Sequence, residues 1–316
     1  MGRRQPDIPL PMAGFVLNVD KPPEWTSHDA VARIRSILRF RKVGHTGTLD
    51  PFATGVLICC VGRATRLSNA LMDLPKTYEG HFRWGQKTDS GDATGEVVAT
   101  SPAVSPSVGD LQAAAREFEG EILQVPPMVS ALKHQGRPLY KLARKGVTVE
   151  RQPRKVRVDA FEILDANEER IGFRVTCSRG TYVRALAEDL AARLGGLAHV
   201  ADLCRTRVGS FARENAVGFD GEWTREALLE RAISMSEALE HLPAWRVPPF
   251  WAAKVRHGQI PPWVVLDVAQ PPRLGSAARL VTTGGDLLAL AEVVPTIGPA
   301  DRDWVDVLAM KLTRVT

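Results

Sequence analysis

The sequence is poor in cysteine, and the spacing of its cysteines excludes several kinds of site. Only four occur among 316 residues: Cys59, Cys60, Cys177 and Cys204. Two are adjacent within an apolar run and no Cys-x-x-Cys pair is present, which excludes the usual zinc patterns and gives no disulfide framework. We therefore expect buried, reduced thiols in a cytoplasmic protein, and no metal.

Long apolar runs are missing as well. No stretch of about 18 apolar residues occurs, so the sequence predicts no membrane-spanning helix. Residues 1–12 carry charge and proline with no apolar segment behind them, which favours a short mobile arm over a signal peptide. There is no internal repeat or low-complexity tract, and 44% hydrophobic with 24% charged residues is typical of a soluble globular protein.

The hydrophobic pattern predicts strands interleaved with helices. The expected strands cover residues 15–17, 56–61, 77–84, 156–164, 170–177 and 200–208. The expected helices cover a segment from Ser27, as N-cap, to about Phe40, and residues 64–72, 111–118, 139–142, 183–194 and 225–239. Hairpin-like turns join some of the strands, which favours an α+β fold with a mixed sheet over residues 13–242.

A proline-rich boundary follows at Leu242–Pro249. Beyond it, Pro-Pro and Gly-Gly pairs separate short strand-like segments such as 286–294 and 304–312. This pattern predicts a second, small β-rich domain over residues 243–316.

The most informative segment runs from Gly44 to Gly55, with the sequence Gly-His-Thr-Gly-Thr-Leu-Asp-Pro-Phe-Ala-Thr-Gly. Glycines at 44, 47 and 55 allow positive φ and close approach of a ligand, and Pro51 restricts Asp50 to an extended conformation. The segment therefore presents one carboxylate rigidly on a loop, where catalytic groups are often found.

Two other interpretations of the acidic and glycine-rich loops fail. A phosphate-binding P-loop requires Gly-Lys-Ser/Thr after its glycines, whereas the segment around Gly47 ends in an acid. The acids Asp89, Asp92 and Glu96 do not have the spacing of an EF-hand calcium loop.

Basic residues are concentrated between Lys133 and Arg157. Nine Lys or Arg lie in this block with one acid, Glu150, although the net charge of the chain is only +5. Exposed faces usually mix charges of both signs, so the block indicates a partner with a phosphate backbone.

Six motifs, in this order, resemble the bacterial TruB family of tRNA pseudouridine synthases. They are Asp20-Lys21-Pro22, Gly-His-Thr-Gly-Thr-Leu-Asp-Pro at 44–51, Lys76-Thr77-Tyr78, Thr-Asp-Ser-Gly-Asp at 88–92, Pro-Met-Val-Ser-Ala-Leu-Lys at 127–133, and Cys-Ser-Arg-Gly-Thr-Tyr-Val-Arg at 177–184. The resemblance covers residues 14–210, and the tail resembles the family's PUA-like RNA-binding domain more loosely. It implies a monomer that needs no protein partner or cofactor and isomerises uridine 55 in the T-arm of tRNA.

The resemblance makes Asp50 the catalytic carboxylate. It would act as a nucleophile on the base or the sugar, or as a base at C2′, and these alternatives stay open. Arg184 would keep Asp50 ionised by lowering its pKa. Tyr78 would stack on the flipped uridine. The family further implies a uridine pocket containing His45, Tyr182 and Leu203, and RNA-backbone contacts from Lys21, Lys133, Arg144, Lys145 and Arg151, with 133–157 as an RNA-clasping segment.

Two positions depart from the family pattern. Arg179 stands where lysine is common, and Cys204 stands where arginine is common, so we expect one phosphate contact to be missing there. Two alternatives remain from the residues alone. One is a pseudouridine synthase with another RNA specificity, such as the RNA-guided relatives, and the other is a non-catalytic RNA-binding or RNA-folding protein on the same scaffold.

Overall fold

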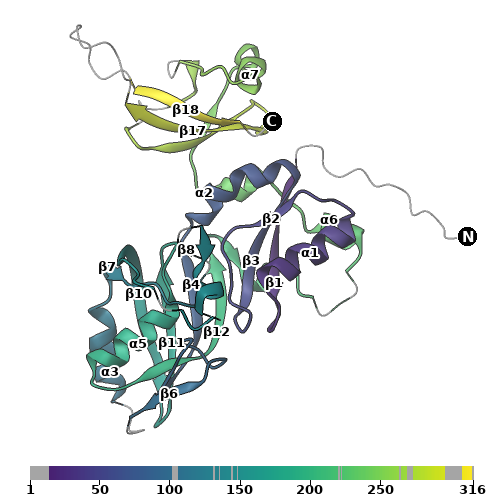
Figure 1. Ribbon diagram of the computed structural model, residues 1–316. Coiled ribbons are helices and arrows are strands. Elements are labelled where there is room, and N and C mark those ends of the chain that lie inside the picture. Colours follow the sequence, from purple (N-terminus) through teal and green to yellow (C-terminus); the bar gives the residue numbers. More distant parts are fainter. Residues whose placement is uncertain are drawn as a thin grey trace, which may run out of the picture.

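The computed structural model describes residues 14–314, except 102–105, 131, 135, 144, 148, 220, 222, 263–264, 269–272 and 296–307 (Figure 1). The arm expected at residues 1–12 lies outside the described residues, so its prediction stays untested.

A ten-stranded mixed sheet forms the body of the protein (Figure 1). Its main path runs β14-β1-β3-β12-β4-β11-β10-β7, with β2 paired to β3 and β13 paired to β12. The strands are β1 (Phe15–Lys21), β2 (Val43–His45), β3 (Thr54–Val61), β4 (Lys76–Trp84), β7 (Gly120–Gln124), β10 (Arg154–Ala166), β11 (Arg170–Cys177), β12 (Ala198–Val208), β13 (Phe211–Ala212) and β14 (Ile233–Ser234). The β3–β12 pair is parallel, whereas β12–β4 and β1–β3 are antiparallel, so the predicted mixed sheet is confirmed.

Helices and short hairpins connect these strands. The helical elements of the body are α1 (Ser27–Leu38), η1 (Gly62–Leu67), α2 (Ser68–Met72), α3 (Val108–Arg116), α4 (Leu139–Ala143), α5 (Val183–Arg193), η2 (Arg213–Asn215), α6 (Arg225–Glu230) and η3 (Glu237–Leu239). The hairpins are β5 (Gln86–Thr88) with β6 (Val97–Thr100), and β8 (Lys133–His134) with β9 (Arg137–Pro138).

The N-terminus of α1 is capped one residue before the predicted position. Thr26 is the N-cap, and its side chain accepts from the backbone N–H of Asp29 while the Asp29 carboxylate accepts from the Thr26 backbone. This is a capping box, in which two otherwise unpaired backbone donors are satisfied. The Ser27 hydroxyl is thereby left for a contact with the loop that carries Asp50.

Two hydrophobic clusters lie to either side of the Asp50 loop. Helices α3 and α5 pack on the half of the sheet formed by β4, β10, β11 and β12, and this cluster includes Leu49 and Ala53 of the loop. Helix α1 packs on β1 and β3 through residues such as Ile34 and Leu38. The loop therefore lies between two independently packed helical layers.

The predicted helix over 225–239 is wrong in its second half. Helix α6 ends at Glu230, and Ile233–Ser234 instead forms β14, which pairs with Val16 and Phe15 of β1. The exposed edge of β1 offers unpaired backbone groups, and pairing with this edge overrides local helix propensity.

The chain ends in a separate four-stranded sheet, in the order β15-β16-β17-β18. Its elements are β15 (Ala244–Arg246), α7 (Pro249–Arg256), β16 (Ala277–Val281), β17 (Leu287–Pro295) and β18 (Leu308–Arg314). The predicted small β-rich region is confirmed. Of the strand expected at 304–312, residues 304–307 lie outside the described residues. No helix within the described ranges is long and apolar enough to cross a membrane.

The thiols follow the sequence prediction with one exception. Cys59, Cys60 and Cys177 are buried and unbridged, and burial raises their pKa values. Cys204 is only half-buried, and its sulfur lies 3.2 Å from an Arg213 guanidinium nitrogen.

Candidate functional site

The Asp50 loop connects β2 to β3 and depends on two of its three glycines. Gly47 has φ +105° and Gly55 has φ +99°, a region that side chains with a Cβ rarely adopt. A Cβ on Gly55 would also lie 2.2 Å from the Arg205 carbonyl oxygen. Gly44 lies within β2 and does not have a positive φ, so the expectation for that glycine is wrong.

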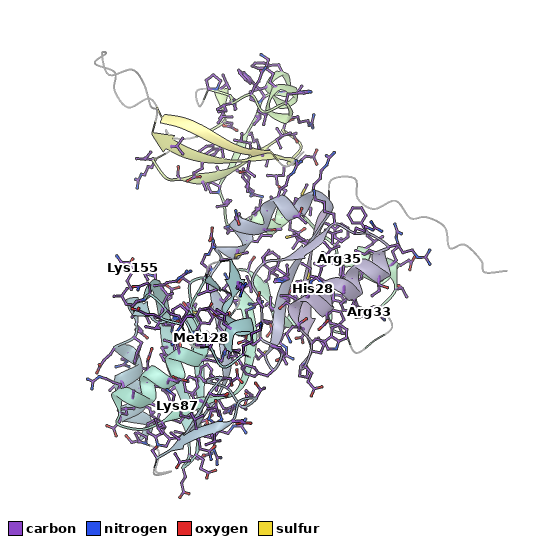
Figure 2. The ribbon with its side chains drawn as sticks, viewed as in Figure 1. His28, Arg33, Arg35, Lys87, Met128 and Lys155 are labelled. Carbon is purple, nitrogen blue, oxygen red and sulfur yellow. The ribbon has the colours of Figure 1, made fainter. Side chains whose placement is uncertain are left out.

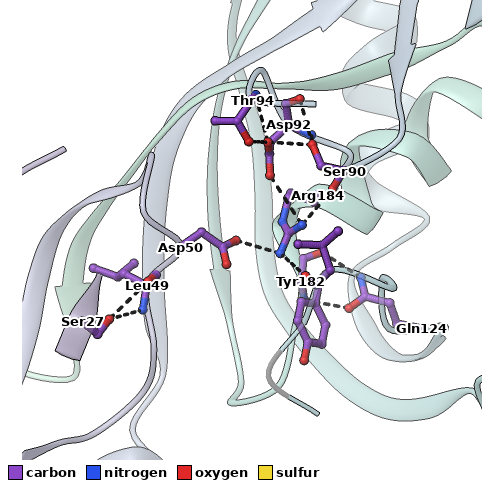
Figure 3. Close-up of polar contacts among 10 residues, drawn as sticks. Ser27, Leu49, Asp50, Ser90, Asp92, Thr94, Gln124, Tyr182 and Arg184 are labelled. Atoms are coloured by element: carbon purple, nitrogen blue, oxygen red, sulfur yellow. Dashed lines mark hydrogen bonds and ion pairs between the residues drawn. The ribbon is translucent and has the colours of Figure 1, made fainter. Parts of the chain in front are cut away.

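Ser27, at the start of α1, holds the loop just before Asp50. The Leu49 backbone N–H donates to Ser27 Oγ at 2.8 Å, and the same hydroxyl donates to the Leu49 carbonyl at 3.2 Å (Figure 3). Both backbone groups of Leu49 are thereby satisfied by one buried side chain. The contact fixes the backbone directly before Asp50.

Lys21 is buried beside the Asp50 loop and does not face solvent, which corrects the predicted contact of Lys21 with RNA. Its side chain is fully buried, and Nζ donates to the carbonyls of Pro22, Trp25 and Pro51 at 2.8, 2.7 and 3.2 Å. Burial is the main cause that lowers its pKa to about 8, against the opposing attraction of Asp50. An ammonium group that is buried and donates to three carbonyls cannot reach a phosphate in this conformation. Lys21 is therefore a structural support of the loop.

Arg184 joins Asp50 to a second loop. Its Nη2 lies 2.9 Å from Asp50 Oδ2, and its Nη1 lies 3.5 Å from Asp92 Oδ2 (Figure 3). The guanidinium also donates to the carbonyls of Ser90 and Val129, both at 2.8 Å. Arg184 thus has four contacts, and only 3% of its side chain is exposed. It is therefore not an exposed surface residue of α5.

The two carboxylates around Arg184 differ in access. Oδ1 of Asp92 accepts from Ser90 Oγ, Thr94 N and Thr94 Oγ1, and the side chain of Asp92 is 5% exposed. The side chain of Asp50 is 36% exposed. Asp92 therefore serves to hold its loop and Arg184, whereas Asp50 is the carboxylate that a substrate can reach.

The pKa of Asp50 depends on burial as well as on the predicted effect of Arg184. Loss of hydration raises its pKa, and Asp92 adds to this rise, while Arg184 and Lys21 lower it. The net direction is upward, because desolvation outweighs the attraction of Arg184. Arg184 lowers the pKa as predicted, but desolvation, which the sequence analysis did not weigh, makes the net shift upward.

Aromatic and apolar side chains line the sheet beside the loop. Tyr78 and Leu203, 9% and 8% exposed, belong to the same cluster as Leu49. The backbone of Tyr182 is fixed by the buried Gln124, whose side-chain amide accepts from Tyr182 N at 2.7 Å and donates to its carbonyl at 3.1 Å (Figure 3). The structure therefore brings Tyr78, Leu203 and Tyr182 to the side of the sheet that carries Asp50 and Arg184.

His45 lies at the end of β2, five residues before Asp50. It is half-buried, its Nδ1 has no hydrogen-bond partner among the described residues, and burial lowers its pKa. The Nδ1 atom is itself buried, so it is not open to a ligand in this conformation, and the predicted part of His45 in the uridine pocket stays a prediction.

The predicted RNA-clasping residues are only partly described. Arg144 lies outside the described residues, and for Lys133 only the backbone is described, within β8. Lys145 is exposed, whereas Arg151 donates to the Pro126 carbonyl at 3.0 Å. Their contacts with RNA remain a prediction.

Arg205 is the residue that the sequence analysis missed. It is 1% exposed, its Nε donates to the Val56 carbonyl at 2.6 Å, and its Nη2 donates to the Gly47 carbonyl at 3.1 Å. Its backbone pairs with Gly55 of β3 and with Tyr78 of β4, and its guanidinium lies 6.0 Å from the Tyr78 ring. Arg205 therefore contacts both ends of the Asp50 loop and lies beside the Tyr78 ring. Its position two residues after Leu203, in a strand of ordinary composition, gave no signal in the sequence.

We expect Arg205→Met to lower kcat far more than it raises KM. Loss of two donors frees the ends of the loop, and a misplacement of about 1 Å can cost about 100-fold in rate. Arg205→Lys, which keeps the charge and one donor, should recover part of kcat. Arg207→Met, the same change at an exposed position of β12, is the control. Equal kcat values for the Arg205→Met and Arg207→Met proteins would contradict the positioning role.

The site offers no group of metal ligands. Among the described parts of the chain, no cluster of three or more His, Cys, Asp or Glu could hold a metal ion. Asp89, from the loop considered above for calcium, instead accepts from the Glu96 backbone N–H at 3.0 Å.

Comparisons with known proteins agree with this geometry. Residues 35–183 match the family model described as TruB family pseudouridylate synthase, N-terminal domain. A tRNA pseudouridine synthase B of Burkholderia lata is 44% identical over 269 residues, covering 84% of this chain and 82% of the relative. One from Moorella thermoacetica is 44% identical over 297 residues, covering 89% and 94%.

The structural comparison extends the similarity to the fold. A chain in the crystal structure of a Cbf5-Nop10-Gar1 complex aligns with a TM-score of 0.72 at 28% identity, over 96% of this chain and 84% of the other. One in a structure of an H/ACA RNP bound to a substrate RNA aligns with a TM-score of 0.70 at 26% identity, over 99% and 90%.

The matching family model and the fold shared with these structures place the chain in the class of pseudouridylate synthases. Within that class, the chain belongs to the TruB family, as its relatives at 44% identity over most of both chains show.

Proposed function

We propose that this enzyme converts uridine 55 in the T-loop of tRNA to pseudouridine. The observation that carries the proposal is the contact of 2.9 Å between Arg184 and the accessible carboxylate of Asp50. The relatives named tRNA pseudouridine synthase B support tRNA as the substrate. The isomerisation cleaves the bond from N1 of uracil to C1′, turns the base, and joins C5 to C1′, so it needs no oxidant and no cofactor.

In this proposal Asp50 is the catalytic residue. As a carboxylate it attacks the base or the sugar, or removes the C2′ proton, and each of these roles requires the ionised form. Arg184, aided by Lys21, favours that form against desolvation. Asp92 keeps Arg184 in place through the network around Ser90 and Thr94.

The uridine must leave its stacked position before it can reach Asp50. Extrusion costs about a few kcal/mol, which stacking and hydrogen bonds in the pocket offset. Tyr78 supplies a ring beside the loop, Tyr182 and Leu203 supply the neighbouring walls, and His45, at the end of β2, is proposed to lie where the RNA loop is opened.

We expect Tyr78→Leu to keep the fold and lose most turnover. Stacking of a base on an aromatic ring contributes about 1–3 kcal/mol, so kcat/KM should fall about 5- to 150-fold. Tyr78→Phe keeps the ring and serves as the control, with turnover close to that of the unaltered protein. If the Tyr78→Leu protein is as active as the Tyr78→Phe protein, Tyr78 is a core residue only.

The basic segment 133–157 is proposed to clasp the T-arm. Changing Arg144, Lys145 and Arg151 together to Gln should weaken tRNA binding and reduce the slope of log affinity against log salt by about 2, at roughly 0.7 per phosphate contact. Turnover at saturating tRNA should fall less, because the segment lies outside the uridine pocket. Arg116→Gln, on the exposed face of α3, is the control. An unchanged slope in the triple variant would make the segment a solvated face.

The C-terminal sheet from Ala244 is proposed to be a PUA-like RNA-binding domain that follows the catalytic domain at 13–242. It packs on the catalytic domain through Val281 and Leu287, which contact the cluster containing Met235 and Leu239. Arg279 also donates to the Ser236 carbonyl at 2.8 Å. We further propose that the enzyme acts as a monomer in the cytoplasm without a protein partner.

A further inference from the structure

A second basic surface lies on the opposite side of the site from the clasping segment. Between Ala30 and Met72 the sequence has seven Lys or Arg and a single acid, the catalytic Asp50. One of the seven, Arg35, donates to the Val43 carbonyl at 2.6 Å. The other six are exposed, and we call five of them the basic ridge: Arg33, Arg39, Arg41, Lys42 and Arg63.

The fold brings the ridge together from two elements. The Gly62 N–H donates to the Lys42 carbonyl at 2.8 Å, so the turn after α1 lies directly against the start of η1, where Arg63 follows. Three acids of this part of the chain are engaged elsewhere: Asp29 in the cap of α1, Asp20 with Arg213, and Asp73 with Arg179. Within the described ranges, the ion pairs involve no ridge residue.

The helix dipole explains only part of this arrangement. Cations near a helix C-terminus are stabilised by about 0.3–1 kcal/mol, and the effect fades within one turn. It can account for Arg39, but Arg33 lies in the middle of α1 and Arg63 lies on another element. Arg39 itself has φ +50°, a left-handed conformation in which glycine is usual at the end of a helix. A charged side chain therefore occupies a position that backbone geometry alone would give to glycine.

The position of the ridge separates it from the uridine pocket. Ser27, at the N-terminus of α1, contacts Leu49, whereas the ridge begins in the middle of this 12-residue helix and its other four members lie beyond the helix C-terminus. At 1.5 Å per residue, the C-terminus of α1 is roughly 16 Å from that contact. The clasping segment enters β10, four strands beyond β3, or about 19 Å across the sheet. Figure 2 shows Arg33 and Arg35 on one side of the molecule and Lys155 on the other.

The chemistry of the ridge fits phosphates better than a protein. Four of its five members are arginines, which bind phosphate oxygens in pairs. Protein interfaces need apolar or aromatic anchors at their centre. The large apolar side chains exposed among the described residues, such as Val97, Leu123 and Phe250, lie outside this region.

We propose that the basic ridge binds the phosphate backbone of tRNA outside the T-arm while the target uridine occupies the Asp50 pocket. The inference rests on the proposed function, since it takes tRNA as the substrate. The ridge and the clasping segment then flank the carboxylate and contact different parts of one folded RNA. The ridge would add affinity and orientation for whole tRNA and leave the chemistry of the uridine unchanged.

The test uses the full chain with Arg33, Arg41 and Lys42 changed together to Gln, leaving the Arg39 cap of α1 intact. Its matched control changes Arg170, Arg174 and Arg193 to Gln. These three arginines are also exposed, but each is already paired with an acid. Dissociation constants are measured across salt concentrations for full-length tRNA and for an isolated T-arm stem-loop, and turnover is measured on both.

We expect the ridge variant to bind full-length tRNA at least tenfold more weakly, with a salt slope smaller by about 2. Its binding to the stem-loop and its turnover of the stem-loop should match the control. Equal losses on both RNAs would overturn the proposal by making the ridge part of the T-arm site. Unchanged binding of full-length tRNA would overturn it by making the ridge a solvated face. Absence of turnover on the stem-loop in the unaltered protein would instead refute the proposed function.

Discussion

Asp50→Asn should abolish pseudouridine formation and leave tRNA binding nearly intact. The amide has almost the same size but is a poor nucleophile and a poor base, and positioned acid–base groups contribute about 100- to 10,000-fold to rate. Arg184 keeps its contacts with Asp92, Ser90 and Val129, so the surrounding site should persist. Single-turnover assays and filter binding on the same preparation measure the two effects.

A matched control for this variant is Asp165→Asn, an exposed carboxylate on β10. It should retain both turnover and binding. Measurable turnover by a cleanly purified Asp50→Asn protein would show that another group performs the chemistry. Loss of binding and turnover together would show that the substitution disturbs the loop.

Arg184→Met should give the second largest loss, with a characteristic pH dependence. The ionised Asp50 is required, and its pKa is already raised, so kcat/KM should fall as pH decreases through a value above the usual carboxyl range. Removing Arg184 takes away the main cause that lowers this pKa. The acid limb of the profile should therefore move to higher pH. Stability should fall by about 3–5 kcal/mol, because the buried Asp92 carboxylate loses its cation.

A substitution at Asp92 is the control for the direction of this pH shift, because Asp92 and Arg184 change the pKa of Asp50 in opposite directions. Asp92 raises the pKa of Asp50, so Asp92→Asn should move the acid limb to lower pH. Arg184→Lys keeps a cation and should fall between Arg184→Met and the unaltered protein. Shifts of both variants in the same direction would mean that the profile reports unfolding of the site and not the ionisation of Asp50.

Hydrophobic periodicity predicted most of the body of the fold. The stripes of α1 and α5 and the strands β3, β4 and β11 lie close to their predicted positions, because their apolar residues follow the helical or strand pattern of the buried face, or in β3 of two buried faces. Where the sequence misled, a tertiary contact decided the local structure. Residues 233–234 became a strand because the edge of β1 lay open.

The site could be predicted only in part. Motif order identified Asp50, Arg184 and Tyr78, which the structure brings to one region of the sheet. Lys21 and Arg205 show what sequence cannot give. Both are cations, yet both are buried and donate to backbone carbonyls of the loop, and only the fold determines whether a basic side chain meets solvent or the interior.

The net direction of the pKa shift of Asp50 could not be predicted for the same reason. A neighbouring arginine can be inferred from a motif, but the desolvation that outweighs it depends on Leu49, Tyr78 and Leu203 packing around the loop. Burial is a property of the assembled structure, so its effect on a titrating group cannot be predicted from residue types alone.

The most direct test is a mass-spectrometric map of pseudouridine in unmodified tRNA incubated with the purified protein. We predict one new pseudouridine, at position 55 of the T-loop, without added cofactor or partner, and none with the Asp50→Asn protein. Pseudouridine at another position, or its absence from tRNA that binds the protein, would contradict the proposed reaction.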